Sequence, residues 1–174
     1  MFTQLGALED DVSEAGDLMA DCLRAGGKVF FCGNGGSAAD AQHMAAELTG
    51  RFVKDRRPLA GIALTTDTSA LTAIANDYGY AHVFSRQIQA LAGPNDCLVA
   101  VSTSGNSSNV VEAVMAAHEA GIPAVGLLGR DGGKVRNLCD VAVMVPSDVT
   151  ARIQEAHGFI GHALCAHIED ALGL

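Results

Sequence analysis

The sequence predicts an α/β protein in which helices cover both faces of a five-stranded parallel sheet, as a three-layer sandwich formed by residues 1–174 as one domain. Two observations lead to this prediction. Five short apolar runs alternate with longer segments of helical periodicity along the whole chain. The runs are apolar at nearly every position, which is typical of parallel strands that are buried on both faces.

The first half of the chain begins with a helix at about Leu5–Arg24, where apolar residues recur at spacings of three and four. A short apolar strand, Lys28–Cys32, follows and ends at a glycine. After it we expect, in chain order, a helix at Ser37–Thr49, a polar link at Gly50–Pro58, a strand at Gly61–Leu64, and helices at Ser69–Asn76 and Val83–Leu91.

The second half alternates strands and helices in the same way. We expect a strand at Cys97–Val101, a helix at Asn109–Ala120, a strand at Pro123–Leu128, a short helix at Lys134–Leu138, a strand at Val141–Val145 and a long helix at Thr150–Leu172. Asn109 stands three residues before Glu112, a capping-box spacing that predicts a helix start at Asn109.

The apolar residues of the first helix form one seam, made of Leu5, Leu8, Val12, Ala15, Met19 and Cys22. Two interpretations of the seam remain open at this point. It packs on the sheet of its own chain, or it joins a helical bundle with other subunits.

Composition disfavours nucleic-acid-binding, membrane and secreted proteins. A net charge of −9 disfavours nucleic acid and anionic membranes as partners. No apolar stretch reaches the roughly 20 residues of a membrane span, and the N-terminus lacks the pattern of a signal peptide, so we expect a cytoplasmic protein. The five cysteines form no C-x-x-C pair, and we expect them to be reduced residues of the core.

A glycine-rich turn, Gly33–Ala38, follows the first strand and opens a helix whose N-terminus offers backbone N–H groups to an anion. The turn also matches the dinucleotide fingerprint. That fingerprint requires an acidic residue about 20 positions further on, whereas the next strand here ends much later, near Asp67. A nicotinamide enzyme is therefore disfavoured.

A second polar turn, Ser102–Ser108, follows the strand at Cys97–Val101. Its hydroxyl groups, together with the free N–H groups of a helix start, can hold phosphate oxygens without a positive charge. The alternative is a serine-rich N-cap loop without a ligand. No P-loop lysine follows, which disfavours a nucleoside triphosphatase. The two turns together predict a crevice for a phosphorylated small molecule.

His43 and Glu47 are four residues apart on the expected second helix, so they share a face. Such a pair can ligate a metal or can act as a base with its partner. The alternative is a surface contact. Arg51 stands one turn later and begins a basic cluster, so it either reaches a ligand or lies in a solvated loop.

The last helix has two strips of residues. His157 and His167 lie on or beside its apolar face, where packing is their expected role, whereas Gln154 and His162 lie on a second strip with Gly158, Gly161 and Cys165. Gln154 and His162 are about 12 Å apart along the axis and can bracket one site. That they bind one metal does not follow from the spacing.

Four motifs, spread over most of the chain, carry a resemblance to a known family. They are Gly33–Ala38 with His43 and Glu47, Leu71–Asp77, Ser102–Ser107, and Arg152–His157 with His162. In combination they resemble the phosphoheptose isomerases, members of the sugar isomerase (SIS) domain superfamily. The resemblance implies a flavodoxin-like SIS domain with an N-terminal helix and a long C-terminal helix.

The resemblance also implies a homotetramer that converts D-sedoheptulose 7-phosphate to D-glycero-D-manno-heptose 7-phosphate, on the way to the heptose of lipopolysaccharide or other heptose-containing products. It implies one Zn²⁺ per subunit, held by His43, Glu47, Gln154 and His162. Substrate contacts are implied for Asn34, Gly35, Gly36, Ser37, Arg51, Asn76, Asp77, Ser102, Thr103, Ser104, Ser107 and Gln154.

Ketose-to-aldose isomerisation through an enediol needs a base and an acid, and the resemblance assigns these roles to Glu47 and His162. A carboxylate and an imidazole bound to zinc carry protons less well than free ones. Either the zinc polarises the substrate oxygens, or the two residues alternate between metal and substrate.

Two other functions belong to the same superfamily. A non-catalytic SIS protein, which binds a phosphosugar or, as a tetramer, the bacterial replication initiator, needs the phosphate turn but not Glu47 and His162. Arabinose 5-phosphate isomerases usually carry further regulatory domains, which we do not expect here. The acid–base pair favours the heptose enzyme.

Overall fold

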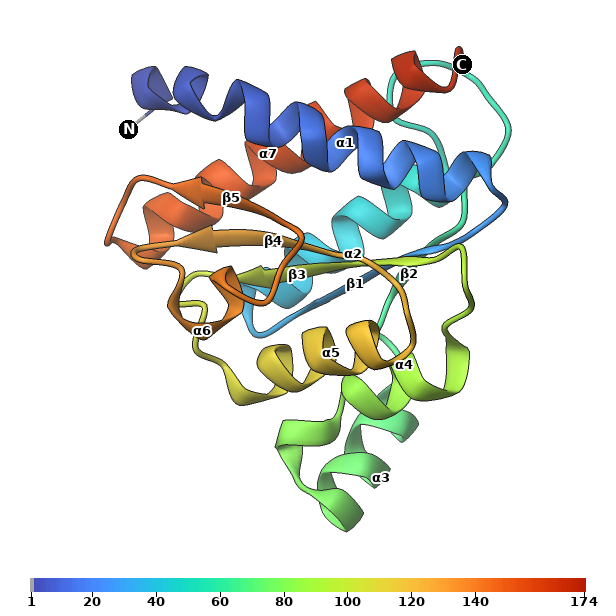
Figure 1. Ribbon diagram of the computed structural model, residues 1–174, viewed down its shortest axis with the longest axis vertical. Coiled ribbons are helices and arrows are strands. Elements are labelled where there is room, and N and C mark those ends of the chain that lie inside the picture. Colours follow the sequence, from blue (N-terminus) through green and yellow to red (C-terminus); the bar gives the residue numbers. More distant parts are fainter. Residues whose placement is uncertain (1) are drawn as a thin grey trace.

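The computed structural model describes residues 2–174 and has the predicted α/β architecture (Figure 1). Its five strands are all parallel and lie in the order β2-β1-β3-β4-β5. The strands are β1 (Val29–Gly33), β2 (Gly61–Ala63), β3 (Cys97–Ser102), β4 (Ala124–Gly129) and β5 (Val141–Val145).

Helices form a layer on each face of the sheet. Figure 1 shows α1 and α7 on one side, α4 and α5 on the other, and α3 furthest from the sheet. The helices are α1 (Glu9–Arg24), α2 (Gly36–Thr49), α3 (Thr68–Tyr78), α4 (Ser85–Leu91), α5 (Ser108–Glu119), α6 (Gly133–Arg136) and α7 (Thr150–Ala171), with 3₁₀ turns η1 (Phe2–Leu8) and η2 (Tyr80–His82).

Two helix starts differ from the prediction. The chain forms the 3₁₀ turn η1 before α1 begins at Glu9, where three acidic residues occupy the first turn and favour a helix N-terminus. The capping box at Asn109 is wrong. Helix α5 begins at Ser108 with Ser107 as its N-cap, because the Asn109 side chain is buried in a pairing with Asn34 instead.

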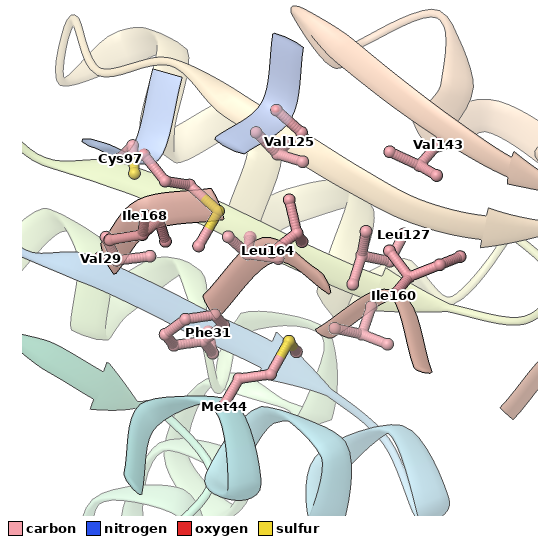
Figure 2. Packing of buried hydrophobic residues seen from close by; sticks show 14 of the residues in the cluster. Val29, Phe31, Met44, Cys97, Val125, Leu127, Val143, Ile160, Leu164 and Ile168 are labelled. Carbon is pink, nitrogen blue, oxygen red and sulfur yellow. The ribbon is translucent and has the colours of Figure 1, made fainter. Parts of the chain in front are cut away.

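The sheet separates two hydrophobic cores. Figure 2 shows the first core, in which Phe31 of β1 and Met44 of α2 pack with Ile160 and Leu164 of α7. Phe30, the neighbour of Phe31, belongs to the second core under α4 and α5. Successive strand residues point to opposite faces, so one apolar strand supplies both cores.

The seam of α1 packs within its own chain. Helix α1 lies against α7 and β5, and its residues Ala15, Met19 and Cys22 are buried in the first core. Leu8 and Val12 pack against the same core but are only partly buried. This arrangement supports the first of the two interpretations of the seam.

All five cysteines lie within the described residues and are free thiols, as expected, and four of them are buried. Burial raises the pKa of Cys165 to about 12, and that of Cys139 likewise, so these thiols stay protonated and weakly reactive. Among the described helices, none is at once long enough and apolar enough to cross a membrane.

Strand β1 lies between β2 and β3, so the order of the strands reverses at the β1–β3 pair. Gly33 at the end of β1 pairs with Val101 near the end of β3. The two polar turns that follow these strands therefore lie side by side. In open parallel sheets, this reversal point is where ligands bind.

Candidate active site

A polar cavity of about 280 Å³ lies between the two turns. None of the described residues that line it carries an ionisable side chain. Its lining consists of Asn34, Gly35, Gly36, Ser37, Val101, Ser102, Thr103, Ser107, Thr150 and Gln154. Seven of the residues expected to contact substrate from the turns, and Gln154 from α7, thus meet in one cavity.

The glycine turn brings α2 and α7 together. Gly35 is the N-cap of α2 and has a φ of 56°, a left-handed conformation that glycine adopts without strain. A Cβ on Gly36 would collide with the side-chain amide of Gln154. The absence of a side chain at Gly36 therefore allows Gln154 to reach the turn from the first part of α7.

The serine turn is held by its own hydroxyl groups. Ser102 Oγ accepts a hydrogen bond from the Gly105 N–H at 3.0 Å, and Ser104 Oγ accepts one from the Asn106 N–H at 3.2 Å. A hydroxyl that accepts one bond still has its own hydrogen to donate. Ser107 caps α5 without a side-chain hydrogen bond to the helix, so its hydroxyl is also available.

Three helices begin at this cavity, since Gly36, Ser107 and Thr150 stand at the starts of α2, α5 and α7. The first N–H groups of a helix have no partner within the helix, and the helix dipole adds partial positive charge there. Neutral donors and three helix N-termini are therefore directed at one small polar space. Such an arrangement favours a phosphate group.

A pair of amides joins the two turns. Asn34 and Asn109 exchange two hydrogen bonds of 2.8 Å, and the Tyr80 hydroxyl donates a third to Asn34 Oδ1 at 3.0 Å. Asn109 is only 2% exposed. The Asn34 side chain is thus fixed from α5 and from η2, with its amide already engaged.

A second cluster lies further along the same two helices. His43 Nε2 is 3.1 Å from Glu47 Oε1 and 3.3 Å from His162 Nε2. One ligand atom from each of the three residues lies within 4.8 Å of the others. The imidazoles meet edge to face, with ring centroids 4.9 Å apart. The structure therefore brings together the predicted pair on α2 and the predicted histidine on α7.

Four predicted substrate residues lie outside the lining of the cavity. Asn76 and Asp77 are exposed at the end of α3 and hydrogen-bond to each other at 2.7 Å. Arg51 is exposed, and within residues 2–174 its side chain makes one hydrogen bond, of 3.5 Å, to the carbonyl of Val53. Ser104 belongs to the serine turn but does not line the cavity. Their roles toward substrate stay predictions.

Two buried side-chain atoms near the site have no hydrogen-bond partner among the described residues, namely Asp40 Oδ2 and His157 Nδ1. Burial raises the pKa of Asp40, although nearby His43 opposes this effect. Burial also lowers the pKa of His157 to about 4, against the opposing effect of its 3.2 Å contact with the Leu128 carbonyl. His157 is therefore a neutral core residue, as its place on the apolar face suggested.

Sequence reasoning missed Asn109, Thr150 and Phe52 as parts of the site. Thr150 could have been predicted, because it begins the helix that also carries Gln154. The Phe52 ring lies 5.1 Å from that of His162, and no local pattern predicts a contact across more than a hundred residues. Asn109 was interpreted as a cap from its spacing to Glu112. Its actual partner, Asn34, is 75 residues away, so no local pattern predicts the pairing.

Comparison with known proteins is consistent with this geometry. A family model described as "SIS domain" matches residues 2–129. The chain is 56% identical over 171 residues to a phosphoheptose isomerase from Rhodospirillum rubrum, covering 98% of this chain and 91% of the relative. A phosphoheptose isomerase from Campylobacter jejuni is 57% identical, with 94% of this chain and 88% of the relative covered.

Solved structures agree with the sequence matches. A phosphoheptose isomerase from Neisseria gonorrhoeae superimposes with a TM-score of 0.88 at 54% identity, covering 92% of this chain and 86% of that one. A phosphoheptose isomerase from Francisella tularensis gives a TM-score of 0.93 at 40% identity, with 97% and 90% covered. The fold and the sequence thus point to the same group of proteins.

Proposed function

The chain belongs to the phosphoheptose isomerases, a family of SIS-domain enzymes, and on this basis we propose that it interconverts D-sedoheptulose 7-phosphate and D-glycero-D-manno-heptose 7-phosphate. One observation carries the proposal. The same two helices, α2 and α7, line a cavity suited to phosphate at their N-termini and carry the His43–Glu47–His162 cluster further on. The heptose product serves the synthesis of heptose-containing glycans such as lipopolysaccharide.

The phosphate of the substrate binds among the donors of the two turns. Ser102, Thr103 and Ser107 offer hydroxyl groups, and the starts of α2, α5 and α7 offer backbone N–H groups. His43 stands seven positions after Gly36 on α2, which places the cluster about 10 Å along the helix. An open-chain sugar phosphate is long enough to extend from the cavity to the cluster.

Glu47 acts as the base at the carbonyl end. It takes a proton from C1 of the ketose to give the enediol, and the return of a proton to C2 gives the aldose. His162 moves the proton between the oxygens on C1 and C2. Glu47 and His162 are linked through His43, by contacts of 3.1 Å and 3.3 Å, so both side chains face a common space.

Zn²⁺ fits the donors present at the cluster. Two imidazole nitrogens and one carboxylate oxygen within 4.8 Å make a donor set that zinc prefers, and they leave a coordination position free. We assign His43, Glu47 and His162 as ligands; the resemblance adds Gln154, whose amide lies against Gly36 in the phosphate cavity and would have to leave it to reach the cluster. When bound, zinc would polarise the oxygens of the substrate at C1 and C2.

We further propose a homotetramer in the cytoplasm. Helix α3 supports assembly, because none of its residues, all of them described, is buried, and the side chains of Tyr78 and nearby Tyr80 are more than half exposed. Tyrosine is enriched at subunit interfaces, so this exposed pair marks a surface that another subunit can cover. The phosphorylated substrate and product belong to the cytoplasm.

The non-catalytic alternative is disfavoured. A protein that only binds a phosphosugar or the replication initiator has no need of Glu47 beside two histidines. The relatives at 56% and 57% identity are both named as isomerases.

The proposal is tested by incubating the purified protein with D-sedoheptulose 7-phosphate and following the aldose by NMR. We expect the C1 proton of the aldose to appear, and deuterium from solvent to enter at C2. Arabinose 5-phosphate and ribulose 5-phosphate serve as alternative substrates. Faster turnover of a pentose phosphate than of the heptose phosphate, or no turnover at all, would refute the proposed function.

A further inference from the structure

A buried ion pair lies beside the histidine cluster. Arg56 Nε is 2.8 Å from Glu169 Oε1, and the two side chains are only 2% and 3% exposed. Arg56 comes from the irregular segment between α2 and β2, and Glu169 comes from the last turns of α7. In Figure 1 this segment passes beside the C-terminal end of α7.

Arg56 fixes the end of α2. Its Nη2 donates to the carbonyl of Glu47 at 2.8 Å, and its Nη1 donates to the carbonyl of Leu48 at 2.9 Å. The last carbonyls of a helix have no partner within the helix, so the guanidinium acts as a side-chain cap. The backbone of Glu47, the proposed base, is thus bonded directly to Arg56.

Glu169 fixes the segment that follows α2. Its carboxylate accepts hydrogen bonds from the backbone N–H groups of Phe52, Val53 and Lys54, at 3.2 to 3.4 Å. Burial alone would raise the pKa of Glu169, but Arg56 and these N–H groups outweigh it and hold the pKa below its ordinary value. The carboxylate therefore stays ionised and keeps its bonds to the segment.

The segment carries Phe52 onto His162. The phenyl ring lies 5.1 Å from the imidazole at an angle of 43°, and the His43 ring contacts the same imidazole edge to face. His162 is exposed overall, and the rings of Phe52 and His43 both contact it. The Phe52 N–H bonds directly to Glu169, and Glu169 is paired with Arg56.

We propose that the Arg56–Glu169 pair is a positioning device for the active site, which holds the end of α2 behind Glu47 and holds Phe52 against His162. The inference rests on the proposed function, since it concerns the residues assigned there as base, acid and zinc ligands. Arg56, Glu169 and Phe52 touch no substrate in this account; they act through Glu47 and His162.

Stability and positioning are separable by experiment. Replacing a buried ion pair with apolar residues of similar volume is often neutral for stability, whereas removing one partner is strongly destabilising. The double variant Arg56→Met/Glu169→Leu should therefore unfold within a few degrees of the wild type, while it lacks the bonds of Glu169 to the segment and those of Arg56 to the end of α2. The matched control is Lys54→Met in the same segment, which loses an exposed ion pair with Asp170 and a hydrogen bond to the Leu174 carbonyl but keeps the bonds of Glu169.

Three quantities are measured for each protein: the unfolding temperature, kcat and KM, and the affinity of the metal-free protein for Zn²⁺ by calorimetry. Residues that orient metal ligands typically change affinity or activity about 10- to 100-fold. We expect losses of that size in kcat and in Zn²⁺ affinity for the double variant, with little change in KM, and wild-type values for Lys54→Met. A folded double variant with wild-type kcat and Zn²⁺ affinity would overturn the proposal.

Phe52→Ala keeps the test decisive if the double variant does not fold. This variant leaves the ion pair in place and should also lower kcat and Zn²⁺ affinity, whereas Phe52→Leu should restore part of both. Unchanged values in Phe52→Ala count against the proposal. If the wild-type protein does not isomerise the sugar at all, the proposed function fails, and the Zn²⁺ affinities still decide whether the pair positions His162.

Discussion

The Nε2 atoms of His43 and His162 lie 3.3 Å apart, although 119 residues separate the two histidines in the chain. Two nitrogens bound at about 2.0–2.1 Å to one tetrahedral zinc stand about 3.3–3.4 Å from each other. The spacing of the two imidazoles therefore matches that of zinc ligands. It is maintained by the packing of α2 on α7, where Gly161 lets Met44 approach closely.

Removal of metal should abolish isomerase activity reversibly. Dialysis against a strong chelator is expected to lower kcat at least about 100-fold, because the proposed polarisation of the substrate oxygens is lost. Added Zn²⁺ should restore the activity, and the zinc content measured by mass spectrometry should approach one ion per chain. Full activity in protein shown to be free of metal would remove zinc from the mechanism.

Glu47→Gln should lower kcat by about 10²- to 10⁴-fold, since an amide cannot take the C1 proton. The fold should persist, because the Glu47 side chain is only partly buried and its backbone carbonyl still receives the bond from Arg56. The measurement is exchange of the C1 proton with solvent, followed by NMR in heavy water. The control is Glu119→Gln, an exposed carboxylate at the end of α5; wild-type exchange in Glu47→Gln would contradict its assignment as the base.

Asn109→Asp should raise KM for the sugar phosphate about tenfold or more. The substitution removes the amide that donates to Asn34 Oδ1 and introduces a buried carboxylate beside the cavity proposed for phosphate. Steady-state kinetics at several pH values measures the effect, which should weaken where the new carboxyl group is protonated. Asn137→Asp, on an exposed residue after α6, is the control, and an equal change of KM in both variants would argue against a specific role for Asn109.

His157 should make the protein less stable in mild acid. Its pKa is about 4 in the folded chain and about 6.5 when unfolded, so the unfolded state binds more protons between these values. The free energy of unfolding then rises with pH over this range, by about 3 kcal/mol from this group alone. Urea unfolding of the wild type and of His157→Leu from pH 4 to pH 7 measures it; parallel curves for the two proteins would contradict the assignment.

The strands and most helices were predictable, because a parallel strand needs only a short apolar run and a helix only a local period. The strand at Val141–Val145 was predicted with the bounds that the structure has. The two turns at the carboxyl edge were also predictable, since glycine and hydroxyl residues after buried strands are typical of turns that open a helix. The structure brings together His43, Glu47 and His162, whereas Gln154, the fourth residue of the expected zinc set, lines the cavity between the two turns.

The interactions that fix these groups were not predictable from local patterns. Asn109 looked like a helix cap, but its partner stands 75 residues away, and the tertiary pairing overrides the local signal. Arg56 belongs to a basic cluster that the sequence suggested was a solvent-exposed loop. Its side chain is nevertheless only 2% exposed. Arg56 becomes part of the site only because the segment between α2 and β2 packs between the C-terminal ends of α2 and α7.

Helix α3 has a consequence for the dynamics of the protein. It is 11 residues long, and only Leu71, Ile74 and Ala75 pack, partly buried, against the second core. Helices of this length are marginal in water without strong tertiary contacts. Its amide protons should therefore exchange with solvent through local opening long before those of the sheet do. Asn76 and Asp77 stand on this helix. Their access to a ligand therefore depends on the contacts that keep α3 helical.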